Sequence, residues 1–377
     1  MELFDVYPLY EITPVKGEGC FVYDEKGTKY LDLYGGHAVI SIGHSHPHYL
    51  EKIGTQLKQL GFYSNSIKNP LQEELAKKLE NVAKITDYSL FLCNSGAEAN
   101  ENALKLASFH TGKSNVIYFE NAFHGRTSAA VAVTDNESIK APINKAQSVC
   151  KLDFEDISGL EEELKKGETA AVIIEFIQGV GGLDEASTRF YQKTAALCEQ
   201  YDAVLIADEV QAGYGRTGDF FAYQKHKIRP DIISIAKGMG NGFPVGGILI
   251  DSSIPPKHGM LGTTFGGNHL ACAAGIAVLE VLEEEQLMEN AKNIFEFVQK
   301  EVVKIPQIKK LKGRGLMLGL EFDFEIAALR KSLLFNQNIF TGAASNKKLL
   351  RILPPLNIQQ KHFKMLFEAL KIELKNY

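Results

Sequence analysis

The sequence has no tryptophan and only five cysteines in 377 residues. The cysteines are scattered, odd in number and never spaced as CxxC, at positions 20, 93, 150, 198 and 272. This usage argues against a disulfide framework or a zinc site, and it fits the reducing cytoplasm, where we expect the protein to reside.

Long apolar runs and a surplus of basic residues are also missing. The longest apolar runs, such as 170–174 and 203–207, are far shorter than the roughly 20 residues of a membrane span, so no membrane association is expected. The N-terminus lacks a basic region followed by an apolar stretch, so no secretory signal is predicted. The formal net charge of -5 makes nucleic acid an unexpected partner.

The middle of the chain alternates short apolar runs with amphipathic stretches. Leucines 71, 75 and 79, for example, recur at helical spacing before an apolar run. This alternation predicts a mostly parallel sheet covered by helices on both faces, with functional residues at the C-terminal ends of the strands. Six strands are predicted, at 89–93, 115–119, 170–176, 203–209, 231–236 and 246–250.

The two ends of the chain have a different pattern. Residues 19–35 predict a hairpin with its turn at 25–27. Towards the other end, the pattern predicts one long helix at about 270–303, strand-like segments at 311–322 and 349–354, and a last helix at about 360–375. We therefore predict an α/β fold, with a large domain at 46–265 and a smaller α+β domain formed by residues 1–45 and 266–377.

Two segments place ionisable side chains directly after apolar strands. Lys237 precedes a glycine-rich turn. A partly buried amine has a lowered pKa and can form a Schiff base, although a surface lysine at the start of a loop would give the same pattern. Asp208 and Glu209 end another strand, where carboxylates are costly unless paired. One of them could pair with a protonated pyridine nitrogen, and the alternative is a structural salt bridge with Arg216.

Two further segments could bind an anion and a flat ring. Ser95 and Glu98 have capping-box spacing at the start of a helix, whose free N–H groups could bind a phosphate or could simply be capped. Phe123 could stack on a flat cofactor or pack in the core. Arg126 could clamp a carboxylate or remain a surface charge.

Other motifs are interpreted as structural or do not occur. Histidines 44, 46 and 48 alternate, but Pro47 breaks the strand and no nearby acid or cysteine completes a set, so a rigid loop is favoured and no metal is expected. Residues 213–218 fit GxGxxG, but they come deep in the chain and lack the ribose-binding acid of a dinucleotide site. Neither GxxxxGK[ST] nor GxSxG occurs, so a nucleoside triphosphatase and a common serine hydrolase are unsupported.

Several of these segments together, in their order, resemble the class III aminotransferases of pyridoxal phosphate (PLP) fold type I. The segments are NSGAEANENALKLA, AFHGRT, LIADEVQAGYGRTG, SIAKGMGNGFPVGG, GTTFGGNHLACAA and LLRILPPL. The likeness runs from about residue 17 to the end. It is greatest to the family members that act on N-acetylornithine or N-succinylornithine.

The resemblance implies PLP as the cofactor and a role for each matched residue. Lys237 would bond covalently to the cofactor and shuttle protons, and Asp208 would pair with the ring nitrogen. Thr264 would reach the phosphate of a neighbouring subunit's cofactor, which implies a homodimer with shared active sites. The other cofactor-binding positions would contact the phosphate (Ser95, Gly96, Ala97), the ring faces (Phe123, Val210) and the phenolic oxygen (Gln211).

The resemblance also implies three substrate-binding residues, and the sequence departs from the family at one position near them. Arg126 would bind the distant carboxylate of the donor or the γ-carboxylate of 2-oxoglutarate, and Arg351 would bind the α-carboxylate of 2-oxoglutarate. Glu175 is kept from the family's EPIQGEGG, but Val180 replaces the second glutamate, which covers the arginine matched by Arg351 in relatives. We therefore expect Arg351 to stay uncovered and the control of donor orientation to be changed.

The implied reaction moves the δ-amino group of N-acetylornithine or N-succinylornithine to 2-oxoglutarate. The products are the N-acylglutamate semialdehyde and glutamate, as in arginine biosynthesis. The alternatives are an ornithine δ-aminotransferase, another ω-amino acid aminotransferase, or a PLP-dependent isomerase or mutase of the same fold, which keeps the amino group on its product. A non-catalytic binding protein is not favoured, because Lys237 is present.

Overall fold

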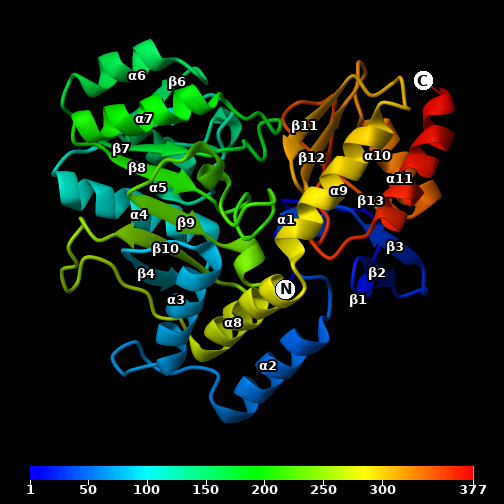
Figure 1. Ribbon diagram of the computed structural model, residues 1–377, viewed down its shortest axis with the longest axis horizontal. Coiled ribbons are helices and arrows are strands. Elements are labelled where there is room, and N and C mark those ends of the chain that lie inside the picture. The colour runs from blue at the N-terminus through cyan, green and yellow to red at the C-terminus, as the bar shows by residue number, and fades with distance from the viewer. Residues whose placement is uncertain (377) are drawn as a thin grey trace.

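A computed structural model describes residues 1–376, and its largest feature is a seven-stranded sheet (Figure 1). The strands lie in the order β4-β10-β9-β8-β7-β5-β6, and β10 alone is antiparallel to its neighbours. In that order they are Tyr88–Cys93, Gly246–Asp251, Ile232–Ile235, Val204–Asp208, Thr169–Ile174, Asn115–Phe119 and Val149–Leu152. The predicted α/β fold with a mostly parallel sheet is confirmed.

The central strands are apolar throughout because both faces of the sheet are covered. Along β7, Ala171 and Ile173 belong to one buried cluster, while Val172 and Ile174 belong to another. Successive side chains of a strand point to opposite faces, so each cluster lies on its own face. All six predicted strands are present, and β6 was missed because its four residues, VCKL, are short and only half-buried.

Helices cover the sheet and connect its strands (Figure 1). The helix α4 packs on β7 to β10, and α7 packs on β8 and α6. No helix within residues 1–376 is both long enough and apolar enough to cross a membrane. The helices are α1 (Gly35–Ala38), α2 (Pro47–Gln59), α3 (Pro70–Ala83), α4 (Gly96–Thr111), α5 (Ser128–Ala132), α6 (Ile157–Leu164), α7 (Thr188–Gln200), α8 (His269–Glu284), α9 (Leu287–Val302), α10 (Ala327–Gln337) and α11 (Gln360–Glu373).

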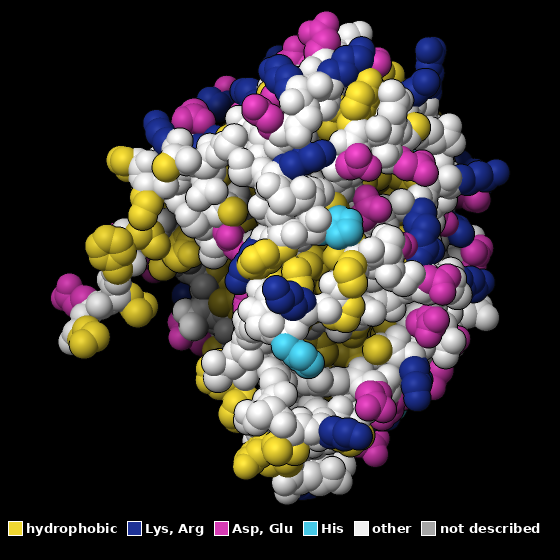
Figure 2. All heavy atoms as spheres, turned by 90° about the vertical axis from the view of Figure 1, so that its left-hand side faces the viewer, with side chains coloured by type: hydrophobic (Ala, Val, Ile, Leu, Met, Phe, Trp, Pro, Cys, Tyr) yellow, Lys and Arg dark blue, Asp and Glu magenta, His cyan; other side chains and the backbone are white. Residues whose placement is uncertain are grey.

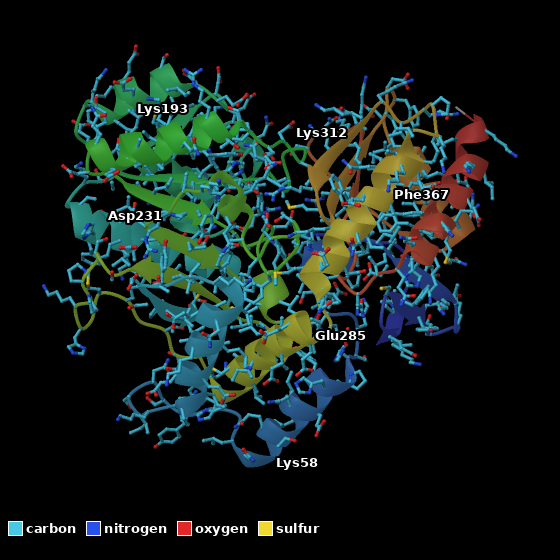
Figure 3. The ribbon with its side chains drawn as sticks, in the orientation of Figure 1. Lys58, Lys193, Asp231, Glu285, Lys312 and Phe367 are labelled. Atoms are coloured by element: carbon cyan, nitrogen blue, oxygen red, sulfur yellow. The ribbon has the colours of Figure 1, made fainter. Side chains whose placement is uncertain are left out.

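The single long helix predicted at about 270–303 is wrong. The structure has two helices there, α8 and α9, and Figure 3 labels Glu285 at the break between them. Gln286 adopts a left-handed backbone conformation with φ of 52°, which ends one helix and redirects the next. Neither glycine nor proline marks the break, so the sequence gives no local signal for it.

The two chain ends form two smaller sheets beside the large one (Figure 1). One contains β1 (Pro14–Glu18), β2 (Phe21–Asp24), β3 (Lys29–Asp32) and β13 (Ile339–Phe340). The other contains β11 (Lys310–Arg314), β12 (Met317–Glu321), β15 (Leu349–Ile352) and β14 (Gly342–Ala343).

These sheets test the predicted organisation of the chain ends. The predicted hairpin is β2 and β3, and the predicted segment 311–322 is itself a hairpin of β11 and β12. The parallel pairing of β3 with β13 confirms that the two ends fold together. The domain boundaries at 45/46 and 265/266 stay predictions, and Tyr377, at the end of the predicted second part, lies outside the described residues.

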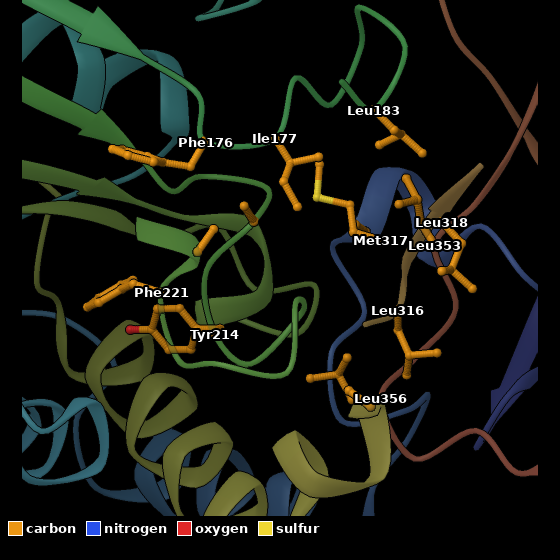
Figure 4. Close-up of a cluster of buried hydrophobic side chains, with 14 of the residues drawn as sticks. Phe176, Ile177, Leu183, Tyr214, Phe221, Leu316, Met317, Leu318, Leu353 and Leu356 are labelled. Atoms are coloured by element: carbon orange, nitrogen blue, oxygen red, sulfur yellow. The ribbon is translucent and has the colours of Figure 1, made fainter. Parts of the chain in front are cut away.

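A buried arginine and a hydrophobic cluster hold the small sheets against the large one. In Figure 4, Ile177 lies beside Met317 of the C-terminal hairpin, and both belong to one buried cluster that also contains Leu316 and Leu353. Arg216 donates hydrogen bonds from Nη1 to the carbonyls of Leu316, at 3.4 Å, and Pro354, and from Nη2 to the carbonyl of Ile40, at 3.3 Å. The alternative that Arg216 pairs with Asp208 or Glu209 is therefore wrong.

We expect Arg216→Met to loosen this junction. Hydrogen bonds to a charged group contribute about 1.5–3 kcal/mol each, and three carbonyls, two of them buried, would lose their donor. The variant should unfold at a clearly lower urea concentration, as followed by circular dichroism. Arg189→Met is the matched control, because Arg189 is exposed on α7 and its loss should change the midpoint little. Equal midpoints for the two variants would contradict the role given to Arg216.

Candidate active site

A cavity of about 350 Å³ lies at the C-terminal ends of the parallel strands. Its walls come from the segments that follow β4, β5, β7, β8 and β9, so residues far apart in the sequence meet at one edge of the sheet. The predicted site residues that line it are Ser95, Gly96, Ala97, Phe123, Arg126, Glu175, Asp208, Val210, Gln211 and Lys237. Arg351 and Thr264 lie outside this lining.

Asp208 ends β8 and is only 5% exposed. Its Oδ2 lies 2.7 Å from Nδ1 of His124 and accepts a hydrogen bond from Nδ2 of Asn100 at 2.8 Å. Its Oδ1 accepts the Val210 N–H at 3.0 Å. The sequence reasoning missed the contacts of His124 and Asn100, although both lie in segments that carry other predicted site residues.

Glu209, the next residue, faces away from the cavity. Its carboxylate accepts the N–H groups of Ala222 and Tyr223, each at 2.9 Å. Burial raises the pKa of Glu209 to about 8. Of the two carboxylates at this strand end, only Asp208 is placed to meet a ligand in the cavity.

Lys237 follows β9 and also lines the cavity. Its backbone is left-handed, with φ of 44°. Burial lowers the pKa of its amine, and the negative charges of Asp208 and Glu175 oppose that shift. A desolvated amine with a lowered pKa is a nucleophile suited to a carbonyl group.

The start of α4 forms another wall. Ser95 is the N-cap, as predicted, and its Oγ accepts the Glu98 N–H at 3.2 Å. The Glu98 carboxylate bonds the N–H of Asn94 at 2.8 Å instead of that of Ser95, so the predicted capping box is displaced by one residue. The N–H groups of Gly96 and Ala97 precede the first intrahelical bonds, and such groups bind anions.

Gly96 allows Val210 to approach the helix start. A Cβ atom at position 96 would lie 2.5 Å from Cγ1 of Val210. The absence of a side chain therefore lets the Val210 side chain and the helix start share one cavity wall.

Glu175 follows β7 and supports the opposite wall. Its two carboxylate oxygens accept the N–H groups of Phe123 and Gly179, each at 2.9 Å. Burial raises the pKa of Glu175 to about 7, and Asp208 acts in the same direction. Each oxygen can accept a second hydrogen bond, so these contacts do not decide the predicted substrate-binding role of Glu175, which stays a prediction.

The two predicted carboxylate-binding arginines differ in environment. Arg126 is exposed at the cavity wall, whereas Arg351 on β15 is only 3% exposed. Arg351 donates from Nη1 to the carbonyl of Gly179 at 2.6 Å, and its guanidinium carbon lies 5.9 Å from the ring centre of Tyr34. Burial lowers the pKa of Arg351.

The expectation that Arg351 stays uncovered by a carboxylate is not contradicted by this arrangement. No carboxylate within residues 1–376 forms an ion pair with it, but the Gly179 carbonyl does occupy one guanidinium nitrogen. The adjacent Val180 lines the cavity with an apolar side chain. Arg351 therefore bonds a neutral acceptor within the described chain.

The remaining predicted positions lie away from the cavity. Thr264 is exposed in the loop before α8, so its predicted contact with a neighbouring subunit stays a prediction.

The three histidines each meet a carboxylate: His44 with Asp32 at 2.8 Å, His46 with Glu285 at 2.8 Å, and His48 with Glu280 at 2.6 Å. The predicted rigid loop ends at Pro47, which starts α2. Within the described chain, no group of three possible ligands is placed to hold a metal.

The residues of the cavity fit PLP. Buried polar atoms without a hydrogen-bond partner in the described chain gather there, namely Nε2 of His124, Oδ1 of Asn100 and Oε1 of Gln211. Unpartnered buried polar atoms indicate a polar ligand. The helix start suits a phosphate, Asp208 suits a ring nitrogen, Lys237 suits an aldehyde, and Phe123 and Val210 provide apolar surfaces for a flat ring.

A lysine and an aspartate at the ends of adjacent parallel strands, beside the start of a helix, are typical of enzymes that use PLP. The family model described as aminotransferase class-III matches residues 6–374, so the chain belongs to the class III aminotransferases, which are PLP-dependent transaminases. The predicted family and cofactor are confirmed.

Individual relatives cover almost the whole chain. The chain is 39% identical to the acetylornithine aminotransferase of Aquifex aeolicus, over 98% of each protein. It is also 39% identical to the acetylornithine aminotransferase of Bacillus subtilis, over 94% of this chain and 93% of that relative. The solved ornithine aminotransferase of Toxoplasma gondii ME49 matches with a TM-score of 0.89 and 27% identity, over 97% of this chain and 91% of that one.

We expect Gly96→Ala to weaken PLP binding. The new methyl group would meet Val210 at 2.5 Å, and overpacking of this kind costs about 1–3 kcal/mol. A tenfold or larger rise in Kd for PLP should follow if the helix start must shift, as measured by calorimetric titration of the apoenzyme. Gly54→Ala on α2, where a Cβ meets nothing within 4 Å, is the control and should bind PLP normally. An unchanged Kd in Gly96→Ala would contradict the proposed phosphate site.

Proposed function

We propose that the enzyme transfers the δ-amino group of N-acetylornithine to 2-oxoglutarate, in the direction of arginine biosynthesis. The observation that carries this proposal is the 39% identity to the acetylornithine aminotransferase of Aquifex aeolicus over 98% of both chains. N-Succinylornithine is a second expected donor, because it differs only in the acyl group.

Most of the site residues would bind the cofactor, and Lys237 would also move the transferred proton. When bound, PLP supplies an aldehyde that takes up the amino group and a ring that withdraws electrons. Asp208 would keep the ring nitrogen protonated, and Ser95, Gly96 and Ala97 would bind the phosphate. Gln211 would bond the phenolic oxygen, and Nζ of Lys237 would take the proton from the δ-carbon of the donor. The lowered pKa of that amine favours its neutral, proton-accepting form.

Two arginines would orient substrates of different length. Arg126, exposed at the cavity wall, suits the far carboxylate of the donor or the γ-carboxylate of 2-oxoglutarate. Arg351, buried and paired only with neutral groups, suits the α-carboxylate of 2-oxoglutarate, because a buried cation gains most from an anionic partner.

The alternative donor is free ornithine, and the likeness to the ornithine aminotransferase of Toxoplasma gondii supports it. Free ornithine carries a second ammonium group beside its carboxylate, which would be repelled by an arginine that binds the carboxylate. N-Acylation removes that charge. The charge of Arg126, which has no ion-pair partner within the described residues, therefore favours the acylated donor.

We infer a homodimer with shared active sites. Exposed hydrophobic side chains lie on α2, on the loop after it and next to Thr264, and Figure 2 shows hydrophobic side chains gathered near the lower edge of the molecule. These residues are Leu57, Leu60, Phe62, Tyr63, Ile67 and Phe265. A patch of this kind favours a protein interface. We also infer a cytoplasmic location, supported by five free cysteines.

Steady-state assays test the proposed reaction. N-Acetylornithine should have at least a tenfold higher kcat/KM than free ornithine, and glutamate should form in equal amount to the 2-oxoglutarate consumed. Lys237→Ala should abolish transfer from every donor. Lys193→Ala is the control, because Figure 3 labels Lys193 on α7, far from the strand ends. A higher kcat/KM for free ornithine would contradict the proposed acylated donor. An active Lys237→Ala variant would overturn the role assigned to Lys237.

Val180→Glu should change the use of 2-oxoglutarate. A carboxylate beside Gly179 could pair with Arg351 and compete with the α-carboxylate of the substrate. We expect a several-fold rise in KM for 2-oxoglutarate with a smaller change for N-acetylornithine. Val180→Gln has nearly the same size without the charge and should leave both KM values close to those of the wild type. Unchanged KM and kcat values in Val180→Glu would contradict the proposal that the residue at this position affects substrate binding by Arg351.

A further inference from the structure

Arg351 does not line the cavity, although the α-carboxylate of 2-oxoglutarate would have to reach it. We propose that Tyr34 is a specificity-determining residue. Its ring covers the Arg351 guanidinium while the amino donor is bound, and it turns aside when that carboxylate arrives. This inference rests on the proposed function, because it needs Arg351 to bind 2-oxoglutarate.

The surroundings of Arg351 leave one of its donors unused. On the two strands beside β15, the residues directly opposite Arg351 are Gly319 and Gly342, which have no side chains to meet the guanidinium. Nη1 donates to the carbonyl of Gly179, whereas Nε is buried and has no hydrogen-bond partner within residues 1–376. A buried cation with an unused donor is well placed to bind an anionic ligand.

Arg351 also lacks an ion pair. The arginines that form ion pairs within residues 1–376 are Arg229 and Arg314. Burial lowers the pKa of Arg351, the charge of Arg330 adds to that shift, and Glu175 opposes it. A neutral group that attracts cations would therefore stabilise Arg351 whenever no substrate carboxylate is present.

The Tyr34 ring provides such a group. The guanidinium carbon lies 5.9 Å from the ring centre, within the distance at which a cation is attracted to an aromatic face. Burial raises the pKa of the Tyr34 hydroxyl, and the charge of Arg351 opposes that rise. The two side chains thus interact, but more weakly than an ion pair would.

Gly342 leaves the space in which the ring lies. A Cβ atom at position 342 would be 2.4 Å from Cε2 of Tyr34 and 3.4 Å from Cβ of Arg351. Even an alanine would therefore push the ring from its place beside Arg351. The ring also meets His37, with the ring centres 4.7 Å apart.

The backbone of Tyr34 is held more firmly than its side chain. The N–H groups of Tyr34 and Gly35 both donate to Oδ1 of Asp32, at 3.0 and 2.8 Å. The ring is only half-buried. Rotation about the Cα–Cβ bond would move the ring away from Arg351 without breaking these hydrogen bonds.

A neutral cover suits substrates that differ in where they carry a carboxylate. The δ-carbon of N-acetylornithine has no carboxylate beside it, so Arg351 keeps its cover in that half of the reaction. 2-Oxoglutarate carries a carboxylate next to its reacting carbonyl. A charge-assisted bidentate pair is stronger than the attraction of a ring, so this carboxylate displaces Tyr34.

Half-reactions measured one at a time test the proposal. Glutamate carries a carboxylate beside its amino group, and the δ-amino group of N-acetylornithine has none. The ratio of their second-order rate constants with the holoenzyme, followed by the cofactor's absorbance, therefore reports how readily Arg351 is uncovered. Tyr34→Ala should raise the ratio of glutamate to N-acetylornithine at least fivefold. Tyr34→Phe keeps the ring and should stay within twofold of the wild type.

Three further variants separate covering from stability. Gly342→Ala displaces the ring without removing it and should raise the same ratio. Tyr30→Ala is the matched control, because Tyr30 is a buried tyrosine of β3 that bonds Asp24 at 3.0 Å. It should lower the thermal midpoint and leave the ratio unchanged. In an Arg351→Gln background, Tyr34→Ala should no longer raise the ratio, because no cation remains to be covered.

The outcomes distinguish this inference from the proposed function. An unchanged or lower ratio in Tyr34→Ala, or in Gly342→Ala if Tyr34→Ala does not fold, would overturn the covering role alone. A ratio in Tyr34→Phe as high as in Tyr34→Ala, or a rise that persists in the Arg351→Gln background, would overturn it too. Failure of the wild-type enzyme to use N-acetylornithine with 2-oxoglutarate would overturn the proposed function, and this inference with it.

Discussion

The site depends on the electrostatic interaction of the Lys237 amine with Asp208 and Glu175 inside a largely buried cavity. Burial alone would drive the amine to its neutral form, and the two acids oppose that shift. The amine therefore gives up its proton more readily than an exposed lysine does, which favours its role as a proton acceptor. Burial raises the pKa of Glu175, and the charge of the neighbouring Asp208 acts in the same direction.

Sheet topology is what brings these groups together. Asp208 ends β8 and Lys237 follows β9, and these strands are adjacent and parallel, so both side chains enter the cavity from neighbouring strand ends. The small sheets contribute Arg351, whose position depends on the junction that Arg216 holds. Gly179 links the large sheet to the small one directly. Its N–H donates to Glu175, which follows β7, and its carbonyl accepts from Arg351 on β15.

Residues that follow an apolar strand could be predicted from the sequence, because the pattern gives both the strand and the exposed edge where it ends. Asp208, Lys237, Ser95 and Phe123 were found in this way. His124 and Asn100 could not be found, because their contacts with Asp208 join positions 84 and 108 residues apart. The break between α8 and α9 was missed for a related reason, since tertiary packing and not a local signal sets the backbone of Gln286.

The covalent attachment of the cofactor at one lysine is the most direct test of the account. The holoenzyme would be reduced with borohydride, digested and mapped by mass spectrometry. We predict a PLP-derived mass on the peptide that contains Lys237 and on no other lysine peptide. Attachment at a different lysine, or none in an enzyme that binds PLP and transfers amino groups, would contradict the site described above.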